Sequence, residues 1–298
     1  MSSSTLDYTR IVTLGHTIVF TVPDRVAQEL GIFERNGVEV VPSGGWTASA
    51  NSFVPGHPER DPLGAFEHVK FDTWNMCEWG AVHRVEKGES RPARIAYLRP
   101  AVVVQAIVSL DRALQEPHDL AGVTVGIHET TGQHYTTLQL LEGTLRRDQI
   151  KVSHGEGNLV DSLHTGEFRA VTVMEPYISL ALKEGAHIIA QTFYRGAQTF
   201  AETVPLGAQQ AYVRSVNEAV DVINAAPDRY RAYITELAGD RLAPEELRRD
   251  YYRYTHAKPY SAERFADTYA WMQSWGLARG DKTFDEIINP AVLSASGV

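Results

Sequence analysis

Hydrophobic positions along this chain alternate between short β-branched runs and longer stretches with helical spacing. Arg10–Leu14 predicts a first strand and Val38–Val41 a second. Between them, Val26 and Phe33 lie on one apolar stripe, and Asp24 is expected to cap that helix. A strand, helix and strand in this order are typical of a parallel sheet.

The central part of the chain continues this alternation. Two near-continuous apolar runs, Ala93–Leu98 and Ala101–Val108, predict two separate buried strands. Further strands are predicted at Phe71–Met76, Val123–Ile127, Ile150–Val152, Ala170–Met174 and His187–Ala190. From about Phe200 onward the pattern is helical. Helices are predicted there at Asn217–Ala225, Pro227–Leu237, Pro244–Tyr254 and Ser261–Trp275.

This order predicts an α/β protein with two Rossmann-like lobes and mixed, mainly parallel sheets joined by a two-strand hinge. Lobe one is expected to comprise residues 1–100 plus 196–298, and lobe two residues 101–195. The helical C-terminal part is expected to pack on lobe one. In such a fold, loops at the carboxyl ends of parallel strands meet at one crevice, which is the expected ligand site.

Composition narrows the possible functions. The 298 residues carry a formal net charge of −9, and no lysine- and arginine-rich stripe suits a nucleic acid. No stretch approaches the roughly 20 apolar residues of a membrane helix, so no membrane insertion is expected. Cys77 is the single cysteine, which excludes an intrachain disulfide. The first residues lack the pattern of a secretory signal, which predicts a cytoplasmic protein, or a periplasmic one if a leader has been removed.

Two segments resemble a known family. Glu116–Ile127 resembles the P-x-D-L-x-G-K-x-V-G turn and strand that opens the second lobe of type II periplasmic binding proteins. Gly166–Tyr177 resembles their later G-x-x-D-A-x-x-x-x-E-P segment. The similarity is greatest to receptors for aliphatic sulfonates, nitrate and thiamine precursors. It implies a small anionic ligand between two lobes and, for a receptor, a transporter permease as partner.

The same fold includes cytoplasmic enzymes, among them a sulfinate desulfinase, a dihydroxyphthalate decarboxylase and dehydratases of menaquinone synthesis. Phe71–Cys77 resembles the decarboxylase pattern of Phe-Asp followed by Glu-Met-Ser, with Asn75 in place of the acid and Cys77 in place of the serine. The desulfinase cysteine follows the first strand, where this chain has Gly15, His16 and Thr17. The desulfinase mechanism therefore does not transfer.

The loop His128–His134 is the clearest candidate for holding an anion. It joins a strand end to a helix start, where free backbone N–H groups and the helix dipole favour negative charge. Thr130 and Thr131 add hydroxyl donors, and Gly132 would let the backbone approach a ligand closely. The alternative is that a threonine simply caps the helix.

The opposite wall offers candidates for proton transfer. His16 lies in the loop after the first strand and is a possible general base, or a surface histidine. Cys77 starts a helix, a position that lowers a thiol pKa and favours a nucleophile or proton donor, although a small buried residue is the alternative. Glu78 is a possible proton shuttle or an ordinary first-turn charge.

Other residues are expected to contact the ligand. Trp46, Trp74 and Trp79 would form an aromatic wall, with packing in the core as the alternative for each. Arg195 would pair with an anion or form a hinge salt bridge, and Glu175 would act as an acid or hold the hinge. The full set of expected binding residues is Thr17, Trp46, Asn75, Trp79, His128, Thr130, Thr131, Gly132, His134, Glu175, Tyr177 and Arg195.

No cofactor or metal is expected. The histidines lack metal-ligand spacing, and the dinucleotide-binding, P-loop and G-x-S-x-G motifs do not occur. Two functions fit these observations. The first is a cytoplasmic, cofactor-independent, decarboxylase-like lyase acting on a small, aromatic or otherwise anionic acid, with His16, Cys77 and Glu78 as catalytic residues. The alternative is the solute-binding protein of an ABC-type importer.

Overall fold

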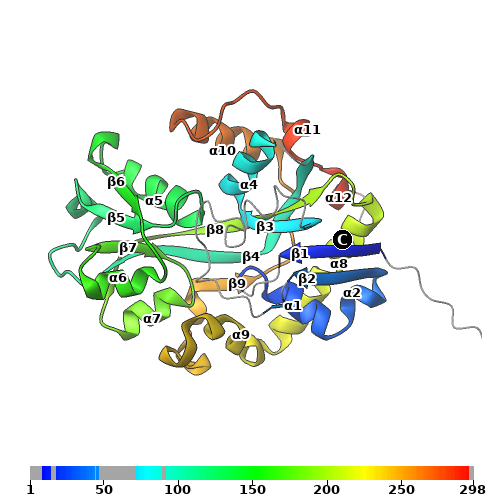
Figure 1. Ribbon diagram of the computed structural model, residues 1–298, viewed down its shortest axis with the longest axis horizontal. Helices are drawn as coiled ribbons and strands as arrows, with labels where there is room; N and C mark the ends of the chain where they lie inside the picture. Colours follow the sequence, from blue (N-terminus) through cyan, green and yellow to red (C-terminus); the bar gives the residue numbers. More distant parts are fainter. Residues whose placement is uncertain (1–8, 15–17, 44, 47–70, 89–91, 295–298) are drawn as a thin grey trace, which may run out of the picture.

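The computed structural model describes residues 9–14, 18–43, 45–46, 71–88 and 92–294. Its strands form a nine-stranded sheet in the order β2-β1-β3-β8-β4-β7-β5-β6, with β9 paired to β4 (Figure 1). The strands are β1 (Thr9–Leu14), β2 (Val38–Ser43), β3 (Thr73–Cys77), β4 (Ala93–Ser109), β5 (Thr124–Ile127), β6 (Lys151–His154), β7 (Ala170–Val173), β8 (His187–Ala201) and β9 (Tyr252–Tyr254).

Helices cover both faces of this sheet (Figure 1). They are α1 (Val22–Glu29), α2 (Ile32–Arg35), α4 (Glu78–Lys87), α5 (Gly132–Glu142), α6 (Leu159–Thr165), α7 (Tyr177–Lys183), α8 (Leu206–Ala225), α9 (Arg231–Thr235), α10 (Ala262–Ser274), α11 (Phe284–Ile287) and α12 (Ala291–Ser294). Short 3₁₀ turns are η2 (Pro117–Leu120), η3 (Arg147–Gln149), η4 (Pro227–Tyr230), η5 (Glu236–Arg241), η6 (Pro244–Glu246) and η7 (Arg249–Tyr251). Within the described ranges, no helix has the length and apolar character to cross a bilayer.

Two long antiparallel strands, β4 and β8, join the two lobes across the middle of Figure 1. Lobe one contains the parallel strands β1–β3 with α1, α2 and α4, and lobe two contains the parallel strands β5–β7 with α5–α7. The two apolar runs at 93–98 and 101–108 were expected as separate strands, which is wrong. They are one strand of 17 residues, irregular between Leu98 and Val102. The expected lobe boundaries at 101 and 195 fall within β4 and β8.

A buried ionic network fixes the start of α1. Asp24 was expected to cap this helix, but Thr21 occupies the cap position and the Asp24 side chain lies inside the lobe, 2% exposed. Arg99, fully buried on β4, donates to Asp24 Oδ1 (3.1 Å) and to the Phe20 carbonyl (2.6 Å). The Tyr212 hydroxyl also donates to Asp24 (2.5 Å). These contacts hold the junction between β1 and α1 against the central strands.

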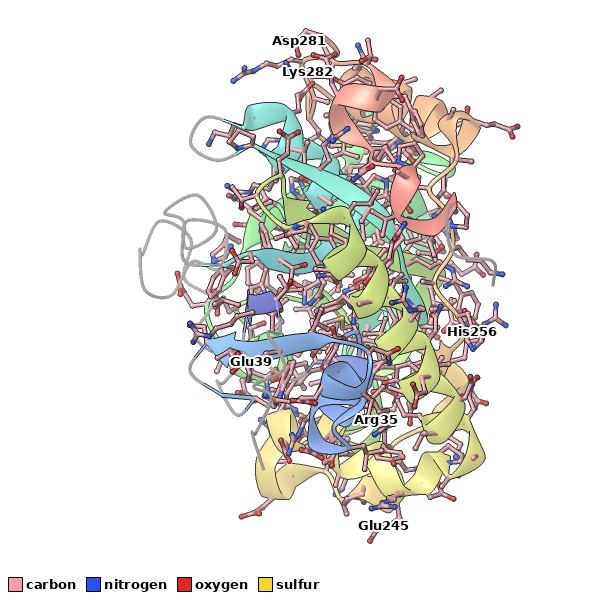
Figure 2. The ribbon with its side chains drawn as sticks, turned by 90° about the vertical axis from the view of Figure 1, so that its right-hand side faces the viewer. Arg35, Glu39, Glu245, His256, Asp281 and Lys282 are labelled. Carbon is pink, nitrogen blue, oxygen red and sulfur yellow. The ribbon has the colours of Figure 1, made fainter. Side chains whose placement is uncertain are left out.

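The chain after β8 packs on lobe one and also contacts lobe two. α8 contacts α1 and α2, which confirms the expected packing of the C-terminal part. The helix expected at 244–254 is wrong, because residues 252–254 form β9 and pair with β4. In Figure 2, Glu245 in η6 and Asp281 before α11 lie at opposite ends of the molecule, so this C-terminal part brackets the sheet.

At one end, η5 and η6 bind helices α6 and α7 of lobe two. Lys183 donates to Glu246 (2.7 Å), and Arg241 pairs with Asp161 (2.6 Å) and with Glu184 (2.8 Å). These pairs lie near the surface, where each ion pair contributes little to stability by itself.

At the other end, α10 binds the end of α5. The indole N–H groups of Trp271 and Trp275 donate to the two carboxylate oxygens of Glu142, at 2.5 and 2.7 Å. The Arg147 guanidinium lies 4.3 Å from the centre of the Trp275 ring. The C-terminal part therefore holds lobe two on both sides of the central strands. We refer to these two sets of contacts together as the interlobe straps.

Candidate ligand-binding site

Four strand-to-helix junctions meet at Tyr194 on β8. The Tyr194 ring is 6% exposed and lies 5.3 Å from the Phe20 ring, after β1, and 5.7 Å from the Trp79 ring, after β3. A Cβ atom added to Gly132, after β5, would lie 2.5 Å from the Tyr194 hydroxyl. That hydroxyl is 3.8 Å from the sulfur of Met174, after β7. The predicted convergence of these junctions therefore occurs around one phenol.

The start of α5 keeps its first amides open. The expected alternative, capping by a threonine, is wrong in the described structure, because no side chain caps α5 and the Thr131 hydroxyl donates instead to the His128 carbonyl (2.7 Å). The first turn of α5 carries no acidic residue. Gly132 allows the Tyr194 hydroxyl to approach the backbone closely.

The loop before α5 is rigidified by its own side chains. Its amides donate from His128 to Gln133 Oε1 (2.8 Å), from Glu129 to His154 Nδ1 (3.3 Å) and from Thr130 to His134 Nδ1 (3.3 Å). Thr130 has φ = 58°, a left-handed conformation that is uncommon outside glycine and persists because of these bonds. The loop amides are thus occupied, whereas the amides that follow Thr131 have no side-chain cap.

The histidines of this loop are uncharged near neutral pH. Burial, followed by the neighbouring His154 ring, lowers the pKa of His128 to about 4, and the His128 Nε2 lies 3.1 Å from the Gly157 carbonyl. Burial also lowers the pKa of His134. Since His134 Nδ1 accepts the Thr130 amide, its proton is assigned to Nε2. These rings therefore act as neutral hydrogen-bonding groups and not as cations.

Cys77 caps α4 from inside the protein. Its sulfur accepts the Gly80 amide at 3.3 Å, and the residue is 5% exposed. Burial raises the pKa of the thiol to about 12, and this effect exceeds the lowering by the Gly80 hydrogen bond. The expectation that the helix start lowers this pKa is wrong, because desolvation dominates. Cys77 is a protonated thiol at neutral pH.

Glu78 pairs with residues of α10 and lines the same cavity as Tyr194. Its carboxylate accepts from Arg264 (2.5 Å) and Thr268 (3.0 Å) at 2% exposure. Burial raises its pKa, while Arg264 acts in the opposite direction. Glu78 and Trp79 line a cavity of about 440 Å³ between α10, α5 and β8. Glu78 is therefore held in a buried ion pair, which does not suit the expected proton shuttle.

Glu175 and Tyr177 connect lobe two to the C-terminal part. Glu175 is 1% exposed and accepts from the amide (3.0 Å) and the hydroxyl (2.6 Å) of Ser179. Burial raises the pKa of Glu175 to about 7. The Tyr177 hydroxyl donates to the Leu237 carbonyl (3.2 Å). The Ser179 hydroxyl also accepts the Arg248 amide, so this junction is tied to η7.

Arg195 neighbours Tyr194 in sequence but lies on the opposite face of β8, because successive strand residues alternate. Its guanidinium donates to the Arg99 carbonyl (2.9 Å) and to the Thr255 hydroxyl (2.8 Å). Of its two expected roles, the hinge salt bridge is not found for Arg195 among the described residues, where its partners are a carbonyl and a hydroxyl. Arg195 thus holds β8 to the C-terminal part on the face away from Tyr194.

Three of the remaining expected site residues, Asn75, Trp46 and Trp79, lie on lobe one. Asn75 is buried on β3, 5% exposed, and its Oδ1 has no partner in the described part of the chain. The Trp46 indole donates to Gln28 Oε1, and the ring is mostly buried. Trp79 is buried among Tyr194 and other rings. His16 and Thr17 lie outside the described residues.

Tyr194 is the central residue that the sequence analysis missed. Its strand was expected to end at Ala190, whereas β8 continues to Ala201. Successive side chains of a strand point to opposite faces. A predicted strand that extended through residue 195 would therefore have placed Tyr194 on the opposite face from Phe193 and Arg195. Among the residues with described positions, no group of three or more His, Cys, Asp or Glu side chains is arranged to hold a metal.

Comparisons with known proteins identify the fold. No family model and no curated sequence matches the chain. Solved structures match over nearly the whole length. The alkanesulfonate-binding protein SsuA from Xanthomonas axonopodis pv. citri, bound to MOPS, has a TM-score of 0.73 at 13% identity, covering 94% of this chain and 99% of SsuA. The ligand-binding component of an ABC-type import system from Staphylococcus aureus has a TM-score of 0.72 at 12% identity, covering 96% and 98%.

An enzyme also matches over nearly the whole length of this chain. The desulfurization enzyme DszB has a TM-score of 0.66 at 13% identity, covering 96% of this chain and 98% of DszB. This protein therefore has the type II periplasmic-binding-protein-like fold, which the sequence predicted. Its structural neighbours include both solute-binding proteins and a desulfurization enzyme.

Proposed function

We propose that this protein binds a small organic anion, a sulfonate or a carboxylate, at the start of α5. The observation that carries this proposal is the uncapped helix start beside the buried Tyr194 phenol. Helix N-termini present free N–H groups and about half a positive charge, which is a favourable environment for an anion. The proposed use is that of a solute-binding protein, with a transporter permease as partner.

The surroundings support this proposal. The first turn of α5 has no acidic residue in a chain of net charge −9, and the nearest acid, Glu129, is exposed. Burial lowers the pKa of both His128 and His134, so these rings offer neutral donors without adding charge. One structural neighbour is described as an alkanesulfonate-binding protein, which agrees with an anionic ligand.

Gln133→Glu tests this proposal with a near-isosteric change in the first turn of α5. Glutamate keeps the side-chain oxygen that accepts the His128 amide, and a negative charge at this position favours the helix itself. It should weaken binding of ethanesulfonate or propanoate by at least about tenfold, since the added carboxylate repels the ligand. Isothermal titration calorimetry measures both anions, with ethylammonium as the cation control.

Gln139→Glu is the matched control, because it makes the same change six residues further along α5, beyond the first turn, and should have little effect. Equal binding of both anions to wild type and Gln133→Glu would refute a site at this helix start. Native mass spectrometry of the purified protein provides an independent readout, since a retained ligand would have the mass of a small organic acid.

A second candidate is the cofactor-independent, decarboxylase-like lyase acting in the cytoplasm, and the interlobe straps favour it. A receptor must open to exchange its ligand, whereas the Glu142 contacts with Trp271 and Trp275 and the Lys183 pair with Glu246 hold the lobes together. Of the carboxyls at the described junctions, Glu175 has a pKa of about 7, which suits proton exchange near neutrality.

The two functions differ in turnover. A lyase would consume small aromatic carboxylates and release carbon dioxide, and Glu175→Gln would slow that release. A binding protein would return the carboxylates unchanged and would expand on losing its ligand, as measured by small-angle X-ray scattering.

A further inference from the structure

The face of the sheet beneath α5 carries a buried carboxamide without a partner. Gln105 on β4 is fully buried, and neither its Oε1 nor its Nε2 has a hydrogen-bond partner among the described residues. Buried polar groups in folded proteins are nearly always paired, because an unpaired one loses its hydration without compensation. A whole unpaired carboxamide at the centre of a sheet therefore needs an explanation.

The strand register places Gln105 next to Tyr194. In the antiparallel pair of β4 and β8, Val103 lies opposite Tyr194 and Gln105 lies opposite Thr192. Residues directly opposite share a face, and so do alternate residues along a strand, so Gln105 and Tyr194 are diagonal neighbours on one face. On the other side of β4, Ala106 lies opposite the last residue of β7, and Met174 follows it.

Helix α5 covers this same face. The Thr137 hydroxyl of α5 lies 2.5 Å from the hydroxyl of Thr172, which is opposite Ile107 and thus on the face of Gln105. The first residue of α5 packs on the Tyr194 hydroxyl, whose acceptor in the described structure is a thioether sulfur at 3.8 Å. Thioethers accept hydrogen bonds weakly. Tyr194 thus lies at the start of α5, whose first amides have no side-chain cap, and Gln105 is its diagonal neighbour on the same face of the sheet.

The geometry points to Gln105 and Tyr194 as specificity-determining residues of the anion site, where they bind the oxygens of a sulfonate that the α5 amides hold. This inference rests on the proposed function and names its ligand class. The first amides of α5, the Tyr194 hydroxyl and the Gln105 amide N–H are donors from three separate elements. A tetrahedral sulfonate presents three oxygens in different directions and can engage all of them, whereas a planar carboxylate has two.

The test compares ethanesulfonate with propanoate on the full chain by isothermal titration calorimetry. Wild type should bind ethanesulfonate at least about tenfold more tightly, the factor expected for one additional hydrogen bond to a charged group. Gln105→Met, close in shape and without polar atoms, should remove most of this preference by weakening ethanesulfonate selectively. It should also raise the Tm of the unliganded protein, since an unpaired buried group is removed.

Tyr194→Phe provides a second variant that keeps the aromatic packing, and it should reduce the same preference. Gln191→Met is the control on the neighbouring strand, because Gln191 is exposed and precedes Thr192, which places it on the opposite face. Circular dichroism checks that each variant is folded.

The outcomes separate the two proposals. If wild type binds neither anion, the proposed function and this inference both fail. If it binds both but the preference is unchanged in Gln105→Met and Tyr194→Phe, the site stands and the assignment of these residues is refuted. A lower Tm in Gln105→Met with unchanged affinities would also refute it, since that result indicates a structural role such as holding a buried water.

Discussion

Glu175→Gln tests whether a buried carboxyl makes this fold more stable in mild acid than in mild base. Burial raises the pKa of Glu175 from 4.5 to about 7. The folded state therefore keeps a proton that the unfolded chain releases at lower pH. The stability from this proton is complete below about pH 4.5, and it is lost as the pH rises through about 7.

The magnitude follows from the shift. The change from 4.5 to about 7 corresponds to about 3–4 kcal/mol of unfolding free energy, at about 1.4 kcal/mol per pKa unit. Wild type should lose about that much more stability than Glu175→Gln between mild acid and about pH 8. Glutamine keeps one oxygen that accepts the Ser179 amide. His128 acts in the opposite direction, because its lowered pKa adds stability as the pH rises from about 4, but it is present in both proteins and cancels.

Urea unfolding followed by circular dichroism at several pH values between mild acid and about pH 8 provides the measurement. Glu167→Gln, which changes an exposed carboxyl shortly before β7, is the control and should follow wild type. If wild type and Glu175→Gln lose the same stability over this range, Glu175 does not carry a proton in the folded state and the reasoning fails.

Three further predictions concern the interior of the protein. Cys77, whose pKa burial raises to about 12, should resist Ellman's reagent at about pH 8 in the native state and react once urea unfolds the chain; rapid native labelling would contradict this. Gly132→Ala should cost about 1–3 kcal/mol in urea unfolding, because the added Cβ would lie 2.5 Å from a tyrosine hydroxyl. Gly143→Ala, with nothing within 4 Å of the added atom, should stay within about 0.5 kcal/mol, and equal effects would refute the contact. Arg99→Met should cost about 3–5 kcal/mol by leaving the Asp24 carboxylate buried without its cation, and a loss below about 1 kcal/mol would show that this pair does not hold the β1–α1 junction.

Local signals in the sequence predicted the parts of the fold that depend on local chemistry. The Ser261 hydroxyl accepts the Arg264 amide at 3.2 Å and starts α10 as expected, and Gly88 ends α4 in a left-handed conformation. Capping and helix termination involve residues three or four positions apart, so the sequence contains the whole interaction. The alternation of strands and helices likewise predicted the junctions that meet at Tyr194.

Interactions between residues far apart in the sequence could not be predicted from local patterns. The tyrosine-rich pattern at 251–254 fits a helix as well as a strand. Residues 252–254 form the strand β9 because they pair with β4. The strand that contains Gln105 was predicted to be shorter than β4 is. The sequence near Gln105 carries no sign that β8 runs beside it as far as residue 201. The length of both central strands depends on their mutual hydrogen bonds.

The sequence by itself determined the fold class, the positions of the junctions and the candidate helix start at Gly132, because periodicity, capping and loop position are properties of neighbouring residues. The tertiary structure decided which side chains are available for chemistry. Glu78 pairs with Arg264, which is 186 positions away, and burial raises the pKa of Cys77 to about 12. Partners and desolvation set the charge of a group, and both arise only when distant segments pack together.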